Sequence, residues 1–239
     1  MAKIFGMNFY EKNISELVDE LDSIIKCDEK ASIFTPNVDH VINNSKDKNV
    51  FDIYSSSEYI IADGWPLVTT SKIKKKSIFR ITGVDLMDKL LELSDREGYS
   101  VFFLGATDDT LIRLKENISN QYKGIKNIGV HNGYFTNNDE VIREINSKKF
   151  NILFVGMGNP KQEIWIRENM KQLDCNLMLG IGGALKIFSQ EVERAPQWVQ
   201  IIGMEWFYRF LKEPKRLFYR YFVKYPKFIR ILTSEVRKK

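Results

Sequence analysis

Short apolar runs alternate with longer amphipathic stretches over most of this chain, and this alternation constrains the fold more than any other feature of the sequence. The runs typical of buried strands include Ala31–Phe34, Val101–Leu104, Ile152–Gly156 and Leu177–Ile181. Segments with helical spacing lie between them, such as Ile14–Ile25, where Asn13 and Glu16 are spaced as a capping box. Alternating strands and helices predict an α/β fold with a mainly parallel, Rossmann-like sheet flanked by helices. The same patterns predict one strand over Ile4–Phe9 and helical structure from Asp39 to Tyr54.

Residues 203–239 differ in composition from the rest of the chain. They hold eleven Lys and Arg against three Glu, whereas the remainder holds 25 basic and 28 acidic residues. Ten aromatic residues lie in the same segment. We therefore predict an α/β core over 1–202 and a basic, aromatic helical appendage over 203–239, which we call the C-terminal segment. Such a segment is typical of binding to an anionic membrane, a nucleic acid or a phosphorylated substrate.

The cysteines and the hydropathy of the sequence indicate in which cellular compartment the protein is expected. Cys27 and Cys175 are far apart and form no Cys-x-x-Cys motif, which excludes a disulfide framework and a zinc cluster and indicates a reducing compartment. The sequence has no apolar run of about eighteen residues, the length expected of a membrane-spanning helix. Because it also has no apolar core of a signal peptide, we expect a cytoplasmic protein.

The stretch Ile60-Ile61-Ala62-Asp63-Gly64-Trp65-Pro66 is a candidate catalytic segment. The apolar run Tyr59–Ala62 predicts a buried strand, which Gly64 and Pro66 end. Asp63 is therefore expected at the carboxyl edge of the sheet, where open α/β folds bind ligands, and its carboxylate is a candidate general base. The alternative is that Asp63 caps a turn or the next helix.

Two further segments present polar side chains near predicted strand ends or helix starts. Thr35 and Asn37 follow the strand Ala31–Phe34, and their short polar side chains suit the hydroxyl groups of a sugar; the alternative is helix capping. Arg80 precedes a predicted helix, where it could hold a phosphate or a carboxylate. A surface ion pair is the alternative for Arg80.

Two glycine-rich turns follow neighbouring predicted strands. The first contains Gly156, Gly158, Lys161 and Gln162, and the second contains Gly182 and Gly183. Glycines allow a ligand to approach the backbone closely, and the start of a helix favours an anion. The spacing is neither that of a dinucleotide fingerprint nor that of a P-loop, so a nucleotide diphosphate site fits better. No Asp-x-Asp triplet occurs, and enzymes that hold a sugar nucleotide through a divalent metal usually need such a pair of oxygen ligands. If the substrate is a sugar nucleotide, we therefore expect no metal and no other cofactor, and arginines, lysines or helix ends would neutralise the leaving diphosphate.

Seven motifs now combine into a family resemblance. They are Thr-Pro-Asn-x-x-His, Ala-Asp-Gly-x-Pro-Leu-Val, Arg-Ile-Thr-Gly-x-Asp-Leu-Met, Phe-Phe-Leu-Gly-Ala, Gly-x-Pro-Lys-Gln-Glu, Arg-Ala-Pro-x-Trp and Glu-Trp-Phe-Tyr-Arg, in that order. From about Phe5 to Tyr221 the chain closely resembles the WecG/TagA/CpsF family of bacterial glycosyltransferases.

The resemblance implies an inverting, metal-independent enzyme that moves a sugar from a UDP-sugar to an undecaprenyl-diphosphate-linked acceptor at the inner face of the plasma membrane. N-acetylmannosamine and lipid-linked N-acetylglucosamine, as in wall teichoic acid synthesis, are the substrates it implies first. N-acetylmannosaminuronic acid or a hexose, for capsule or exopolysaccharide, is the alternative donor sugar. The resemblance assigns the general base to Asp63 and further active-site positions to Thr35, Asn37, Arg80 and Gln162. It also implies that the C-terminal segment approaches the membrane and supplies arginines to the site, for which Arg209, Arg216 and Arg220 are the candidates.

One departure from the family pattern bears on the donor. Lys186 stands where the family commonly has an acidic residue near the nucleotide. This motivates an alternative function, a UDP-sugar-binding regulator without catalysis. A nucleic-acid-binding protein that uses the basic segment is a second alternative, which the seven motifs disfavour. Self-association of the chain is left open.

Overall fold

A computed structural model describes residues 1–45 and 47–237 of this chain, without the side chains of Asn44, Arg216 and Arg220. Its main sheet has six strands in the order β4-β3-β8-β7-β5-β6, and every neighbouring pair is parallel. The strands are β3 (Ala31–Phe34), β4 (Tyr59–Ile60), β5 (Val101–Gly105), β6 (Ile128–His131), β7 (Ile152–Gly156) and β8 (Leu177–Gly180). The predicted α/β fold with a parallel sheet flanked by helices is confirmed.

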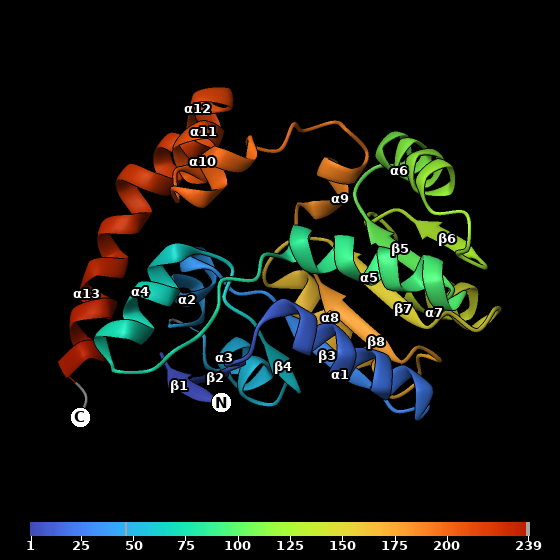
Figure 1. Cartoon of the computed structure of the whole chain (residues 1–239), viewed down its shortest axis with the longest axis horizontal. Helices are drawn as coiled ribbons and strands as arrows, with labels where there is room; N and C mark the ends of the chain where they lie inside the picture. Colours follow the sequence, from blue (N-terminus) through green and yellow to red (C-terminus); the bar gives the residue numbers. More distant parts are fainter. Residues whose placement is uncertain (46, 238–239) are drawn as a thin grey trace.

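Helices cover both faces of this sheet (Figure 1). One face carries α1 (Ile14–Lys26), α5 (Gly83–Glu97), α6 (Asp108–Gln121) and α9 (Ala184–Phe188). The other carries α2 (Val38–Asn44), α3 (Lys48–Ser55), α7 (Asn138–Asn146) and α8 (Lys161–Asn169). Asn13 caps α1 and forms the predicted capping box with Glu16.

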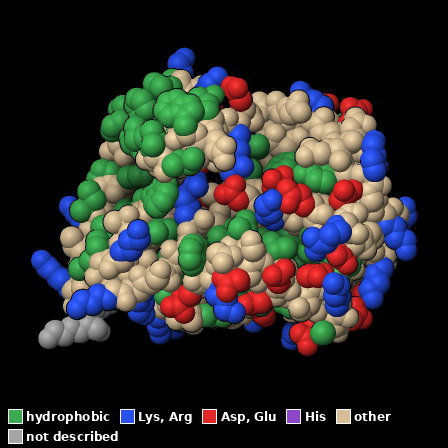
Figure 2. Space-filling view, in the orientation of Figure 1, with side chains coloured by type: hydrophobic (Ala, Val, Ile, Leu, Met, Phe, Trp, Pro, Cys, Tyr) green, Lys and Arg blue, Asp and Glu red, His purple; other side chains and the backbone are tan. Residues whose placement is uncertain are grey.

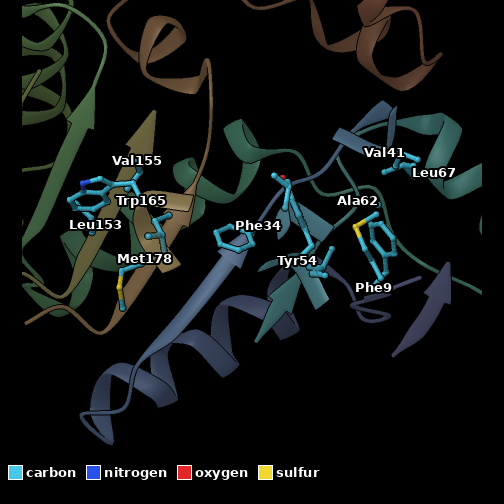
Figure 3. Close-up of a cluster of buried hydrophobic side chains, with 14 of the residues drawn as sticks. Phe9, Phe34, Val41, Tyr54, Ala62, Leu67, Leu153, Val155, Trp165 and Met178 are labelled. Atoms are coloured by element: carbon cyan, nitrogen blue, oxygen red, sulfur yellow. The ribbon is translucent and has the colours of Figure 1, made fainter. Parts of the chain in front are cut away.

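Alternate residues of the strands divide the core into two clusters. In β5, Phe102 and Leu104 belong to one cluster, while Val101 and Phe103 belong to the other. Strands buried on both faces read as continuous apolar runs, and this is why the central strands could be predicted from the sequence. Figure 3 shows the first cluster, in which the rings of Phe34 and Tyr54 pack edge to face with their centroids 5.4 Å apart.

Three local predictions need correction. The predicted strand Ile4–Phe9 is an antiparallel hairpin of β1 (Ala2–Ile4) and β2 (Met7–Phe9), apart from the main sheet. Phe5 and Gly6 form its turn, both with positive φ. The helical stretch from Asp39 to Tyr54 is two helices, because Asp47 caps α3 separately. The predicted strand Tyr59–Ala62 is shorter, because β4 ends at Ile60. As predicted, no strand continues to Pro66, which lies in the first turn of a helix, α4 (Trp65–Ile73), a position that suits the fixed φ of proline.

Residues from Gln197 onward are largely helical and lie beside the core on one side of the molecule (Figure 1). The elements are α10 (Gln197–Ile201), α11 (Glu205–Lys212), α12 (Pro214–Phe218), the π-helix η1 (Tyr219–Lys224) and α13 (Tyr225–Arg237). Helix α13 packs against α2 and α4, where Phe228 is buried and Lys74 pairs with Glu235 at 3.1 Å. No helix among the described residues is both long and apolar enough to cross a bilayer.

Candidate active site

Polar residues converge at the carboxyl edge of the sheet, as the sequence predicts. Thr35 follows β3, and its hydroxyl donates a hydrogen bond of 3.0 Å to the carbonyl oxygen of Gly180 at the end of β8. The backbone N–H of Asp63 donates to the carbonyl oxygen of Pro36 at 3.0 Å. These bonds hold the exits of three neighbouring strands together, at the edge where parallel α/β sheets bind ligands.

A cavity of about 430 Å³ opens at this edge, between the core and the C-terminal segment. Asn37, Asp63 and Arg80 line it from the core, and Glu205 and Arg209 line it from α11. The rest of its wall is largely apolar or aromatic, with Val38, Trp65, Pro66, Val84, Trp206, Tyr221, Phe222 and Tyr225. A concave, mainly apolar site with a few convergent charged groups is typical of small-molecule binding.

Glu205 connects two of the arginines that the sequence predicts. Its carboxylate accepts from Arg80 at 2.6 Å and pairs with Arg209 at 2.9 Å. The side chains of Arg80 and Glu205 are 15% and 14% exposed, so this pair is largely shielded from water. The ion-pair alternative for Arg80 is thus correct, although the pair is largely shielded and not at the surface, and it joins the core to the C-terminal segment. The role of Arg80 in binding a phosphate stays a prediction. Sequence reasoning missed Glu205, although it opens the Glu-Trp-Phe-Tyr-Arg motif.

The local backbone explains how Asn37 and Asp63 are placed. Asn37 caps α2, and its side-chain oxygen accepts from the backbone N–H of Asp39 at 2.9 Å; the capping alternative is thus correct for Asn37, which also lines the cavity. The cap position of α4 is Gly64, with φ of 135°. Only glycine adopts that conformation readily, and Asp63 lies directly before it, on the cavity wall.

The two glycine turns are joined by Gln162. Its side-chain oxygen accepts from the backbone N–H groups of Gly158 and Gly182, each at 3.1 Å. Gln162 is only 1% exposed, so its amide lies beneath the turns. A Cβ atom added at Gly158, Gly182 or Gly183 would meet no heavy atom within 4 Å. The outer sides of these turns are therefore open to a ligand.

The remaining predicted residues lie around these turns or in the C-terminal segment. Gly156 ends β7, and a Cβ atom there would lie 2.9 Å from the carbonyl oxygen of Gly182. Lys161 is exposed at the start of α8. The side chains of Arg216 and Arg220 lie outside the described part of the structure, so their predicted role stays a prediction.

Lys186, the departure from the family pattern, is paired with an acid. Its ammonium group donates to Glu191 at 2.7 Å, and the hydroxyl of Thr110 donates to the other carboxylate oxygen at 2.7 Å. The hydrogen bond from Lys186 lowers the pKa of Glu191 below its ordinary value. A carboxylate is thus present next to Lys186, contributed by a residue five positions later.

Charges of both signs in one apolar-walled cavity suit a transferase whose leaving group departs as an anion. The model of the "Glycosyl transferase WecG/TagA/CpsF family" matches residues 2–239. The chain therefore belongs to this family and is a glycosyltransferase.

Two relatives with described activities are similar over most of their length. An N-acetylglucosaminyldiphosphoundecaprenol N-acetyl-beta-D-mannosaminyltransferase of Staphylococcus aureus (strain MW2) is 31% identical over 218 residues, which cover 90% of this chain and 85% of the relative. The protein of the same name from Bacillus subtilis (strain 168) is 30% identical over 240 residues, which cover 99% of this chain and 93% of the relative.

Proposed function

We propose that this enzyme transfers N-acetylmannosamine from UDP-N-acetylmannosamine to N-acetylglucosamine linked through a diphosphate to undecaprenol, with inversion at the anomeric carbon. The names of both relatives support this acceptor and this sugar. The observation that carries the proposal is the cavity in which Asp63 lies with Arg80 and Arg209. The glycolipid product of this reaction would serve the synthesis of a cell-surface polymer, such as wall teichoic acid.

In the proposed reaction, Asp63 acts as the general base. As the acceptor hydroxyl attacks the anomeric carbon, its proton passes to the Asp63 carboxylate and a new C–O bond forms. The bond from the anomeric carbon to the diphosphate breaks on the opposite face, and its electron pair leaves with UDP. Positioning of the two substrates and stabilisation of the departing anion would provide most of the rate enhancement.

The basic groups of the cavity are proposed to replace a metal ion. Arg80 and Arg209 are fixed by Glu205, and both line the cavity. A guanidinium stays charged at any working pH and binds phosphate oxygens in a bidentate manner. We propose that these arginines stabilise the diphosphate without a metal or cofactor, and that Arg216 and Arg220 assist them.

We propose that the UDP-sugar lies against the glycine turns, and Gly183→Ala tests this. The φ of Gly183 is −78°, which alanine adopts readily, and a Cβ atom there meets nothing within 4 Å. The protein should fold with unchanged thermal stability. A methyl group that intrudes on a bound ligand costs about 1–3 kcal/mol, so the KM for the donor should rise roughly tenfold or more. An unchanged donor KM and an unchanged inhibition constant for UDP would place the donor elsewhere.

We further propose that the C-terminal segment binds an anionic membrane surface and keeps the enzyme at the inner face of the plasma membrane. Figure 2 shows a hydrophobic patch over α10, α11 and α12, with Lys and Arg side chains at its margin. Exposed apolar residues of these helices include Trp198, Ile201, Trp206, Phe207, Leu211 and Phe218. Apolar side chains beside basic groups are typical of interfacial helices.

Leu211→Glu tests this membrane contact. Leu211 is 62% exposed on α11, and burial of a leucine contributes about 1.5–3 kcal/mol. Its replacement should weaken binding to phosphatidylglycerol vesicles by roughly tenfold or more, measured by co-sedimentation. Ile112→Glu is a matched control, because Ile112 is 57% exposed on α6, away from the patch (Figure 1). Equal binding by both variants would contradict the proposed surface.

A donor screen tests the proposed function. The purified enzyme is mixed with a short-chain lipid-diphosphate N-acetylglucosamine and one UDP-sugar at a time, with EDTA present, and UDP release and product mass are followed. We expect turnover with UDP-N-acetylmannosamine. Turnover only with UDP-N-acetylmannosaminuronic acid or a UDP-hexose would instead indicate a capsule or exopolysaccharide enzyme. Binding of UDP-sugars without any product would support the non-catalytic regulator.

A further inference from the structure

A buried carboxyl group, that of Glu163, lies next to Gln162 in α8, and the mechanism above gives it no role. Its side chain is 0% exposed. Burial raises the pKa of this carboxyl above its ordinary value. Replacement of a buried ionisable group by an apolar side chain is often neutral or stabilising, so the packing of α8 does not by itself explain an acid at this position.

On one side, Glu163 fixes the orientation of Gln162. The amide nitrogen of Gln162 donates to Glu163 Oε1 at 2.9 Å. This bond leaves the amide oxygen of Gln162 directed at the N–H groups of Gly158 and Gly182. A rotated amide would present N–H groups to N–H groups, which cannot form hydrogen bonds. The carboxylate therefore determines how the two glycine turns are joined.

The carboxylate oxygen of Glu163 that accepts from Gln162 also approaches His40, which contacts Asn37 at the cavity wall. His40 Nε2 lies 3.8 Å from Glu163 Oε1, and His40 Nδ1 lies 2.8 Å from the side-chain oxygen of Asn37. The backbone N–H of Asn37 also donates to His40 Nδ1 at 3.2 Å. The same histidine thus contacts both the buried acid and a residue that lines the cavity beside Asp63.

A second contact of Glu163 reinforces this connection. The amide nitrogen of Asn159 donates to Glu163 Oε2 at 3.2 Å and to the hydroxyl of Tyr54 at 3.2 Å. The side-chain oxygen of Asn159 accepts from Asn43 of α2 at 2.9 Å. Groups from α2, α3 and the first glycine turn are therefore tied to one carboxylate.

We propose that Glu163 is a positioning residue that, through Gln162 and His40, holds the glycine turns and Asn37 in one fixed relative arrangement. This inference rests on the proposed function, in which the UDP-sugar lies against the glycine turns and both its diphosphate and the acceptor hydroxyl meet the groups of the cavity. Both substrates must be held in register for direct displacement, and a misplacement of about 1 Å can lower the rate roughly a hundredfold. Glu163 would act on the reaction without touching either substrate.

The test compares Glu163→Gln with a control on the same helix. The carboxylate of Glu163 accepts from Gln162 on one oxygen and from Asn159 on the other, whereas the introduced glutamine has one acceptor oxygen only. Its N–H₂ group must therefore face the N–H₂ group of Gln162 or that of Asn159, so one of the two bonds is lost and the joined arrangement is disturbed. We expect kcat to fall roughly a hundredfold while the protein stays folded. Asn169→Ala is the control, because Asn169 is 3% exposed in α8 and bonds to Asn138 and Gln172 instead. It should lower the melting temperature but leave kcat within about threefold.

A paired exchange tests positioning directly. In the double variant Gln162→Glu with Glu163→Gln, a carboxylate at position 162 can accept from both glycine N–H groups and from the new amide at position 163. The kcat of the double variant should be at least about tenfold higher than that of Glu163→Gln, because the pattern of hydrogen-bond donors and acceptors is restored. If Glu163 only stabilised the fold, activity would follow the folded fraction of the protein in both Glu163→Gln and Asn169→Ala.

His40→Ala provides an independent arm if Glu163→Gln does not fold. The His40 side chain is polar and 13% exposed, and a thermal unfolding curve shows whether the variant folds. We expect kcat to fall about tenfold or more as Asn37 loses its support. Every assay uses a donor that the wild-type enzyme turns over. Failure of the proposed function would therefore be seen with the wild-type enzyme, before any variant is compared with it. The inference would be overturned by a wild-type kcat in Glu163→Gln or in His40→Ala. It would also be overturned by an equal loss of kcat in Asn169→Ala, or by a double variant that folds but does not recover kcat.

Discussion

The variant Asp63→Asn should lose about two to four orders of magnitude in kcat and keep its fold. A positioned general base contributes about 10²–10⁴-fold to a rate, and an asparagine amide cannot accept the proton of the acceptor hydroxyl. The shape of the side chain is retained at the cavity wall, where the backbone bond to Pro36 and the turn at Gly64 hold this position. Initial rates at saturating donor and acceptor, together with a thermal unfolding curve, measure both expectations.

Asp88→Asn is the matched control for this prediction. Asp88 is an acid on α5 that accepts from the hydroxyl of Tyr122 at 2.9 Å and does not line the cavity. Because it lies outside the site, its replacement should leave kcat within about threefold of the wild-type value. Near-normal turnover by Asp63→Asn, or equal losses in the two variants, would remove Asp63 from the role of base.

The second large effect is expected for Arg80→Gln, which should lower kcat/KM by about 10²–10³-fold. Loss of one group that stabilises a developing anion typically has an effect of this size. The Arg80 side chain lines the cavity and is 15% exposed, so part of its guanidinium can face a phosphate oxygen there. Steady-state kinetics with varied donor and the inhibition constant of UDP measure the change.

Two further variants separate charge stabilisation from docking of the C-terminal segment. Glu205→Gln weakens the attachment of α11 but leaves the charge of Arg80 in place. Glu193→Gln weakens the contacts that Glu193 makes with Lys212 and Tyr208 on the exposed side of α11, at 3.1 and 3.2 Å. We expect the loss in kcat/KM to be largest for Arg80→Gln, smaller for Glu205→Gln and within about threefold for Glu193→Gln. If Glu205→Gln matched Arg80→Gln, docking of α11 alone would explain the effect of the arginine.

The sequence predicted the central architecture because its physical signals are local. The runs Val101–Leu104 and Ile152–Gly156 are apolar on both faces, as strands covered by helices on both sides must be. The hairpin at the N-terminus was missed because Phe5, an apolar residue, occupies its turn. Helix α4 was foreseen only in the alternative that Asp63 caps the next helix, because Pro66 was interpreted as the end of a strand, although proline also starts helices. The cap position is in fact Gly64.

Part of the candidate site could be predicted because some of its residues also follow from local signals in the sequence. Strand ends identified Thr35, Asn37 and Asp63, since parallel strands place their carboxyl ends at one edge. The contact of Arg80 with Glu205, by contrast, joins residues 125 positions apart. Such a pair has no periodicity or spacing that a single sequence could reveal. The bonds of Gln162 likewise depend on the relative placement of two turns, which only the folded chain specifies.

The configuration of the new glycosidic bond is the measurement that tests the account most directly. The wild-type enzyme would be given an α-linked UDP-sugar that it turns over, and the anomeric configuration of the lipid-linked product determined by NMR. Direct displacement with Asp63 as the base predicts a β-linked product, because the acceptor attacks the face opposite the departing UDP. An α-linked product would contradict the account, since retention requires a covalent intermediate or attack from the same face as the leaving group.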